Sequence, residues 1–98
     1  MGFEFDPAES AMNERERGLP FAAALRLFDG PRLEWEDGRH DYREVRIGAL
    51  GEIEGRVFFV TFTRRADTIR IISFRKANAL ETKKYRDYVS TRGKDRTD

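Results

Sequence analysis

The sequence predicts an α+β domain with two N-terminal helices, an antiparallel sheet of about four strands and one C-terminal helix. The order of the hydrophobic patterns and the length of the chain lead to this prediction. Apolar residues first recur at helical spacing, then alternate with polar residues, and a helical segment follows residue 76. The 98 residues fit one domain with a single small core. We expect residues 1–90 to form that domain and residues 91–98 to form a polar, disordered tail.

The N-terminal third is expected to contain both early helices. Residues 3–5 form a short apolar segment that suits an edge strand. Asp6 and Pro7 suit the N-cap and the first position of a helix that ends before Gly18, a residue that tolerates positive φ. A second helix opens at Pro20 and carries a core-facing stripe at positions i, i+3, i+4 and i+7, namely Phe21, Ala24, Leu25 and Phe28.

The middle of the chain is expected to form the sheet. Four strands are predicted, at residues 32–35, 42–50, 56–63 and 69–76. Glycines bracket residues 51–55, which suit the hairpin connection between the second and third strands, and the charged residues 64–68 turn the chain back again. The last strand is apolar on both faces at its start, which indicates a central position in the sheet. From Ala77, a helix is expected to continue to about Ser90.

The last predicted strand changes character along its length. With regular alternation, one face carries Ile69, Ile71, Ser73 and Arg75, and the other carries Arg70, Ile72, Phe74 and Lys76. The first of these faces passes from core residues to Ser and Arg. A strand with this pattern can form the floor of an active or binding site.

Charge is distributed unevenly along the chain. The net charge is +1, but residues 1–54 contain seven Lys/Arg against thirteen Asp/Glu, whereas residues 64–86 contain eight against two. A basic second half indicates a surface for nucleic acid or another polyanion. Mutual neutralisation of the two halves across the fold is an equally good interpretation.

Several classes of protein are excluded or disfavoured by composition. The chain has no cysteine, which excludes a disulfide framework and a thiolate zinc site. A single histidine argues against a transition-metal centre, and no glycine-rich phosphate loop precedes a helix, so we expect no metal and no cofactor. No apolar run approaches the length of a membrane span and the N-terminus lacks a signal pattern, which makes a cytoplasmic protein the default.

Four segments resemble a known family: Glu4-Phe5-Asp6-Pro7, Asn13 with Gly18, the run from Leu33 to Tyr42, and the run from Arg64 to Lys76 followed by Tyr85. They are similar to the BrnT-type toxins of bacterial type II toxin–antitoxin systems, over residues 3 to about 88. The resemblance implies a RelE-like fold and a metal-free ribonuclease that inhibits translation. It also implies a BrnA-like ribbon-helix-helix antitoxin as partner, with operator DNA contacted only through that antitoxin.

One position departs from the family pattern. Glu16-Arg17-Gly18 stands where family members commonly have Lys-His-Gly. An acidic side chain at a phosphate contact would repel RNA, whereas Arg17 would restore the cation but not the proton-carrying capacity of a histidine. Two alternatives to the nuclease therefore stay open. One is a catalytically weak homologue that acts as antitoxin partner and co-repressor, and the other is an RNA-binding module that does not cleave.

Metal-free RNA cleavage needs a base for the 2′-OH, cations for the charge that develops on phosphate, and an acid for the departing 5′ oxygen. Arginine binds phosphate through two parallel hydrogen bonds, serine can donate one, and histidine alone titrates near neutrality without perturbation. The candidate catalytic residues are therefore Arg64, Arg70, Ser73, Arg75 and His40. The candidate RNA-binding residues are Arg17, Arg65, Lys76, Lys83, Lys84 and Tyr85.

Most candidates also have a purely structural interpretation. His40 in a charged loop can simply order that loop, and Arg70 can pair with Glu44 or Glu36 across the sheet. Tyr85 is as well suited to the core as to a site. These side chains are consequently ambiguous from sequence alone.

Arg75 is the strongest single candidate because it ends the expected central strand beside Ser73. Trp35, by contrast, is expected to pack against Phe21 or Phe28 rather than to stack on a base. The predicted site is therefore a cluster of guanidinium groups at the end of the middle strand.

Overall fold

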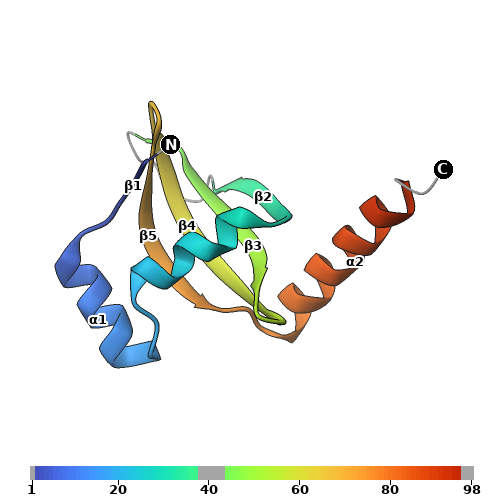
Figure 1. Ribbon diagram of the computed structural model, residues 1–98, viewed down its shortest axis with the longest axis horizontal. Coiled ribbons are helices and arrows are strands. Elements are labelled where there is room, and N and C mark those ends of the chain that lie inside the picture. Colours follow the sequence, from blue (N-terminus) through green and yellow to red (C-terminus); the bar gives the residue numbers. More distant parts are fainter. Residues whose placement is uncertain (1, 38–43, 96–98) are drawn as a thin grey trace.

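The computed structural model describes residues 2–37 and 44–95, with side chains described as far as Thr91. Within these ranges it contains five strands and three helices, which confirms the α+β class (Figure 1). In chain order the elements are β1 (Gly2–Glu4), α1 (Pro7–Arg17), the 3₁₀ helix η1 (Phe21–Asp29), β2 (Arg32–Asp37), β3 (Arg46–Ile53), β4 (Arg56–Arg65), β5 (Thr68–Lys76) and α2 (Ala79–Asp95).

The sheet has one strand more than predicted. Its order is β1-β5-β4-β3-β2, and the four long strands pair antiparallel as expected. The N-terminal segment adds β1 at the edge, parallel to the start of β5, so the sheet is mixed rather than purely antiparallel. β5 therefore lies between two strands over its first three residues, and its edge beyond Arg70 is free for α1.

The hairpin turns are tighter than predicted. β3 continues to Ile53 and β4 begins at Arg56, so Glu54 and Gly55 form a two-residue turn, with φ of 49° and 81°. Positive φ at both central positions matches the right-handed twist of the flanking strands. Between β4 and β5, the expected turn over residues 64–68 shrinks to Ala66 and Asp67.

The α1 helix has the predicted ends. The side chain of Asp6 accepts a hydrogen bond of 2.8 Å from the backbone N–H of Ala8, and Gly18 adopts φ 73°. Asn13 attaches the helix to the sheet, because its side-chain amide donates to the carbonyl oxygen of Phe74 over 2.9 Å. α1 therefore runs along the free edge of β5.

One face of the sheet, here called the inner face, packs against η1, which crosses it in Figure 1. The predicted stripe of this helix is wrong at Leu25, because a 3₁₀ helix repeats every three residues and places Phe21, Ala24 and Leu27 on one side. Leu27 is fully buried over Gly51, where an added Cβ would lie 2.6 Å from the leucine side chain.

The pairing of β4 with β5 contains a β-bulge. Thr61 pairs with Ser73 and Phe62 pairs with Ile71, which leaves Ile72 without a partner of its own. An extra residue reverses the alternation of side chains beyond it. Ile72 still lies beside Arg70, as predicted, and the regular alternation predicted for this strand is wrong from Ser73 onward.

The bulge redistributes the side chains of β5 between the two faces. Phe74 joins Ile69 and Ile71 in the inner-face core, where all three are at most 2% exposed. The opposite, outer face then carries Arg70, Ser73 and Arg75 together. Regular alternation would have placed Arg70 on the other side of the sheet from Ser73 and Arg75. One irregularity in the strand thus gathers polar side chains on one side of the sheet.

The outer face is covered by α2 at one end. Leu50, Val57 and Tyr85 form a small second core there, and Val89 packs against it one helical turn later. α2 then extends away from the sheet (Figure 1). It was expected to run from Ala77 to about Ser90 but begins at Ala79 and continues to Asp95. In the part of the chain that the structure describes, no helix is long and apolar enough to cross a membrane.

Candidate functional site

A row of directly opposed residues crosses the outer face. Trp35 pairs with Gly48, Gly48 with Thr61, and Thr61 with Ser73, on β2, β3, β4 and β5 in turn. Residues opposite one another in a sheet point to the same side. Apart from the tryptophan, this central row carries small residues.

Cations lie on both sides of the central row. On the side toward α2, the next row places Phe59 opposite Arg75. On the other side, Thr63 stands opposite both Arg46 and Arg70. The hydroxyl groups of Thr61 and Ser73 therefore lie between two arginine-bearing rows.

Arg75 is held firmly at its end of the outer face. Its guanidinium donates two hydrogen bonds of 2.8 Å to the carboxylate of Glu81 on α2 and lies 4.4 Å from the ring centroid of Phe59. Hydrogen bonding to Arg75 is the main reason why the pKa of Glu81 is lowered, and the pKa of Arg75 is correspondingly raised. The pair is therefore fully charged at neutral pH.

Arg70 lies at the other end, beside a hollow of about 270 Å³ lined by Glu9, Glu44, Arg46, Thr63, Arg65, Arg70 and Ile72. The guanidinium of Arg70 lies 3.8 Å from the carboxylate of Glu4 on the neighbouring β1. Glu44 forms hydrogen bonds of 2.7 and 2.5 Å with Arg65, and these are the main reason why the pKa of Glu44 is lowered. The pairing of Arg70 with Glu36 considered from sequence does not occur, because Glu36 pairs with Ile47 on the inner face.

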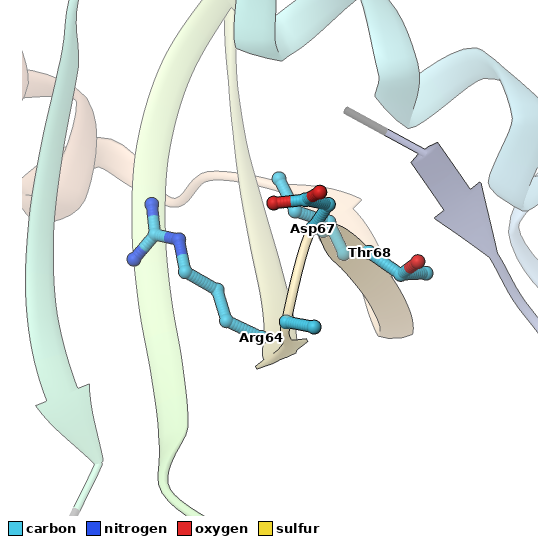
Figure 2. A pocket seen from close by; sticks show the side chains of 5 residues that line it. Arg64, Asp67 and Thr68 are labelled. Carbon is cyan, nitrogen blue, oxygen red and sulfur yellow. The ribbon is translucent and has the colours of Figure 1, made fainter.

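Arg64 does not belong to this cluster, which corrects the sequence prediction. Its guanidinium lies on the inner face, 3.4 Å from Glu34 and 5.2 Å from the ring centroid of Phe62. Figure 2 shows the side chain reaching across β3, beside a shallow hollow of about 300 Å³ that Asp67 and Thr68 also line. Since the sheet separates it from the outer face, Arg64 cannot bind the same phosphate as the arginines of β5.

Tyr85 also departs from its predicted role in RNA binding. It is 2% exposed in the core under α2, and its hydroxyl donates a 3.1 Å hydrogen bond to the carbonyl oxygen of Pro31. Burial raises the pKa of this hydroxyl. The ring therefore has no free face for a base.

The remaining predicted cations differ in their distance from the cluster. Lys84 lies three residues after Glu81 on α2, and Glu81 is the carboxylate that pairs with Arg75. Lys83 is exposed and pairs with Asp87 over 2.7 Å. Lys76 stands opposite Phe58, in the register of the inner face. Arg17 is exposed one turn beyond Asn13, at the end of α1 that approaches β5, and His40 lies outside the described residues.

Trp35 was expected in the core and lies instead on the outer face. It is 41% exposed, and its ring centroid is 5.5 Å from that of Phe59 rather than near Phe21 or Phe28. The sequence alternation of β2 does place Leu33 and Trp35 on one face. It does not indicate that this face is the one opposite η1, and the position of the tryptophan on the outer face was therefore not predicted.

Metal ligands can be assessed only for the described residues. Among residues 2–37 and 44–95, no three His, Asp or Glu side chains are gathered in a way that could hold a metal ion. The outer face presents guanidinium, carboxylate, hydroxyl and aromatic groups.

The fold and this face define an α+β protein with an arginine-lined sheet surface, a kind of surface that attracts polyanions. The family described as the ribonuclease toxin BrnT of type II toxin–antitoxin systems matches residues 5–81, and the chain belongs to that family. The family makes it the toxin of such a system, a ribonuclease with an RNA target and an antitoxin partner. No curated protein matches the chain significantly.

Proposed function

We propose that the chain is a metal-independent endoribonuclease that inhibits translation and that the outer face is its active site. The observation that carries this proposal is the bulge at Ile72, because it places Arg70, Ser73 and Arg75 on one face. Five residues of strand span roughly 15 Å, so two long arginine side chains can converge on a phosphate held above Ser73. Guanidinium groups suit the two non-bridging oxygens of such a phosphate.

The proposed reaction is an internal transfer of the phosphodiester. The ribose 2′ oxygen bonds to phosphorus and the bond from phosphorus to the 5′ oxygen breaks, which leaves a 2′,3′-cyclic phosphate and a 5′-hydroxyl. A base takes the 2′ proton and an acid supplies a proton to the 5′ oxygen. Arg70 and Arg75 stabilise the negative charge that develops on the non-bridging phosphate oxygens, and Ser73 donates a hydrogen bond to one of these oxygens. His40 is the candidate proton carrier.

Further cations extend the proposed binding surface. Lys84 continues it from Arg75 onto α2, Arg65 continues it past Arg70, and Arg17 continues it onto α1. Lys76 and Lys83 add positive charge at its margin. Glu16 places a negative charge beside Arg17, which weakens that end of the surface.

An RNA digest tests the proposal. The full chain, freed of antitoxin, is incubated with RNA in EDTA, and the product ends are mapped for 2′,3′-cyclic phosphate. Arg75→Gln and Arg70→Gln should each lower the cleavage rate by about 100-fold. Arg64→Gln is the matched control, since it removes an arginine from the other face, and it should cleave like wild type. Equal loss in all three variants, or cleavage that requires a divalent ion, contradicts the proposal.

A second candidate function is supported by the carboxylates on the outer face. Arg75, Arg65 and Arg70 each lie within 4 Å of a glutamate oxygen, an arrangement that neutralises much of the cluster before RNA arrives. A homologue that does not cleave RNA could bind RNA, or act as co-repressor, while these arginines remain paired with the glutamates. In that case the digest shows no product, although oligonucleotide binding persists.

The antitoxin partner is proposed to be a BrnA-like ribbon-helix-helix protein that supplies the contacts to operator DNA. Co-expression gives the test. Induction of the toxin should arrest growth, the antitoxin should restore growth, and purified toxin alone should not bind operator DNA. Operator binding by the toxin alone would contradict this division of roles.

A further inference from the structure

We propose that Trp35 is a stacking site for an unpaired nucleobase of the bound RNA. The inference rests on the proposed function and adds to it a base-binding subsite that phosphate chemistry alone does not require. Trp35 occupies one end of the central row and Ser73 the other. Three strand spacings separate them, roughly 14 Å. The stacked base therefore belongs to a nucleotide near the scissile phosphate and not to the reacting one.

The backbone of Gly48 leaves room for the indole ring of Trp35 to lie flat against the sheet. Gly48 lies directly opposite Trp35, and an added Cβ there would come within 2.9 Å of the indole atoms Cε2 and Cζ2. The ring thus lies against bare backbone at a distance that any other residue would prevent. Phe59 supports it from the side, with the two ring planes inclined at 46°.

A ring fixed in this way is prepared for stacking. Ordering a mobile side chain costs free energy on binding, and Trp35 has already been ordered by Gly48 and Phe59. It is still 41% exposed, so a large apolar surface remains available to a ligand. Stacking on an aromatic residue tolerates every base, because each base has a π-face.

The charges around the aromatic pair favour a nucleotide over an uncharged ligand. The guanidinium of Arg75 lies on the ring of Phe59, which in turn contacts Trp35. A base on Trp35 and a phosphate near Arg75 can therefore be bound together. Interleaved aromatic and basic side chains are the usual arrangement for single-stranded nucleic acid.

The chain contains a single tryptophan, so its fluorescence reports on this site alone. The probe is a 2′-deoxy oligonucleotide, which cannot be cleaved by 2′-OH attack, labelled for anisotropy. Anisotropy measures binding and tryptophan emission measures contact with Trp35. Emission should be quenched in proportion to the bound fraction. An abasic oligonucleotide of equal charge should bind without that quenching.

Variants separate stacking from a structural role. Trp35→Phe should keep most of the affinity, whereas Trp35→Leu should weaken binding by about tenfold. Gly48→Ala keeps the tryptophan but displaces its ring, and should reduce quenching at equal occupancy. If Trp35→Leu fails to fold, the comparison of base-containing and abasic probes in the wild type still decides.

The outcomes distinguish this inference from the proposed function. Binding without quenching, or equal quenching by the abasic probe, overturns the role of Trp35 and leaves RNA binding intact. Absence of any change in anisotropy contradicts the proposed function and the inference together.

Discussion

Asn78 and Glu81 cap each other across the first turn of α2. The backbone N–H of Glu81 donates to the side-chain oxygen of Asn78 over 2.8 Å, and the backbone N–H of Asn78 donates to the Glu81 carboxylate over 2.9 Å. That carboxylate also receives both hydrogen bonds from Arg75. One acidic side chain therefore joins the start of α2 to the arginine that ends β5.

Glu81→Gln should separate these two roles. Glutamine retains the capping geometry but loses the charge that pairs with Arg75. We expect the free energy of unfolding to fall by about 1 kcal/mol, because the pair is only partly buried. Oligonucleotide affinity should rise, since phosphate no longer competes with a carboxylate for Arg75. Urea unfolding and anisotropy measure the two effects.

Glu54→Gln is the matched control for this substitution. Glu54 also pairs with an arginine, Arg26, but both side chains are more than half exposed, and neither residue belongs to the arginine-bearing rows of the outer face. Neither stability nor affinity should change measurably. If Glu81→Gln leaves affinity at the wild-type level, Arg75 does not contact phosphate as proposed.

The same pair predicts a pH dependence of stability. The pKa of Glu81 lies below its ordinary value of 4.5 in the folded protein, chiefly through Arg75. A carboxyl with a lowered pKa stabilises the fold above its unfolded pKa and loses that contribution as pH falls through the folded pKa. The stability difference between wild type and Glu81→Gln should therefore be constant above about pH 5.5 and shrink below about pH 4.5. Urea midpoints from pH 3 to 7 test this, and a difference that is undiminished at pH 3 would refute it.

Gly51→Ala tests the packing of the 3₁₀ helix on the inner face. A methyl group there would lie 2.6 Å from Leu27, which is fully buried and cannot move aside without displacing η1. We expect a loss of about 1–3 kcal/mol in the free energy of unfolding. Gly30→Ala is the control, because nothing lies within 4 Å of its added Cβ and its φ of −122° suits alanine. Equal stability of the two variants would show that η1 is loosely packed.

Local patterns predicted the elements of this fold better than their arrangement. Asp6 and Gly18 marked the ends of α1 correctly because capping depends on neighbouring residues. The core side of η1 was wrong at Leu25, since apolar spacing does not reveal whether a short helix has three or 3.6 residues per turn. β1 was recognised only as a suitable edge segment, because its parallel partner lies more than sixty residues away.

The site shows the same limit more clearly. The chemistry of Arg70, Ser73 and Arg75 makes them candidates, but regular alternation places Arg70 on the other face. The bulge at Ile72 that unites them follows from pairing with β4 and leaves no local mark in the sequence. Arg64 and Trp35 were misplaced for a related reason, because the faces of a sheet are distinguished by which helix covers each one.

The salt dependence of RNA binding provides a final test of which cations contact phosphate. Each phosphate contact on a single strand contributes a slope of about −0.7 to log K against log[salt]. Arg70→Gln and Arg75→Gln should each make the slope shallower by about 0.7. Arg64→Gln should leave it unchanged, because that guanidinium lies on the inner face beside Glu34. Trp35→Leu should weaken binding at every salt concentration with an unchanged slope, since stacking releases no counterions. If Arg64→Gln and Arg75→Gln change the salt slope equally, RNA binding depends on total charge. That result would contradict the outer face as the specific RNA-binding site.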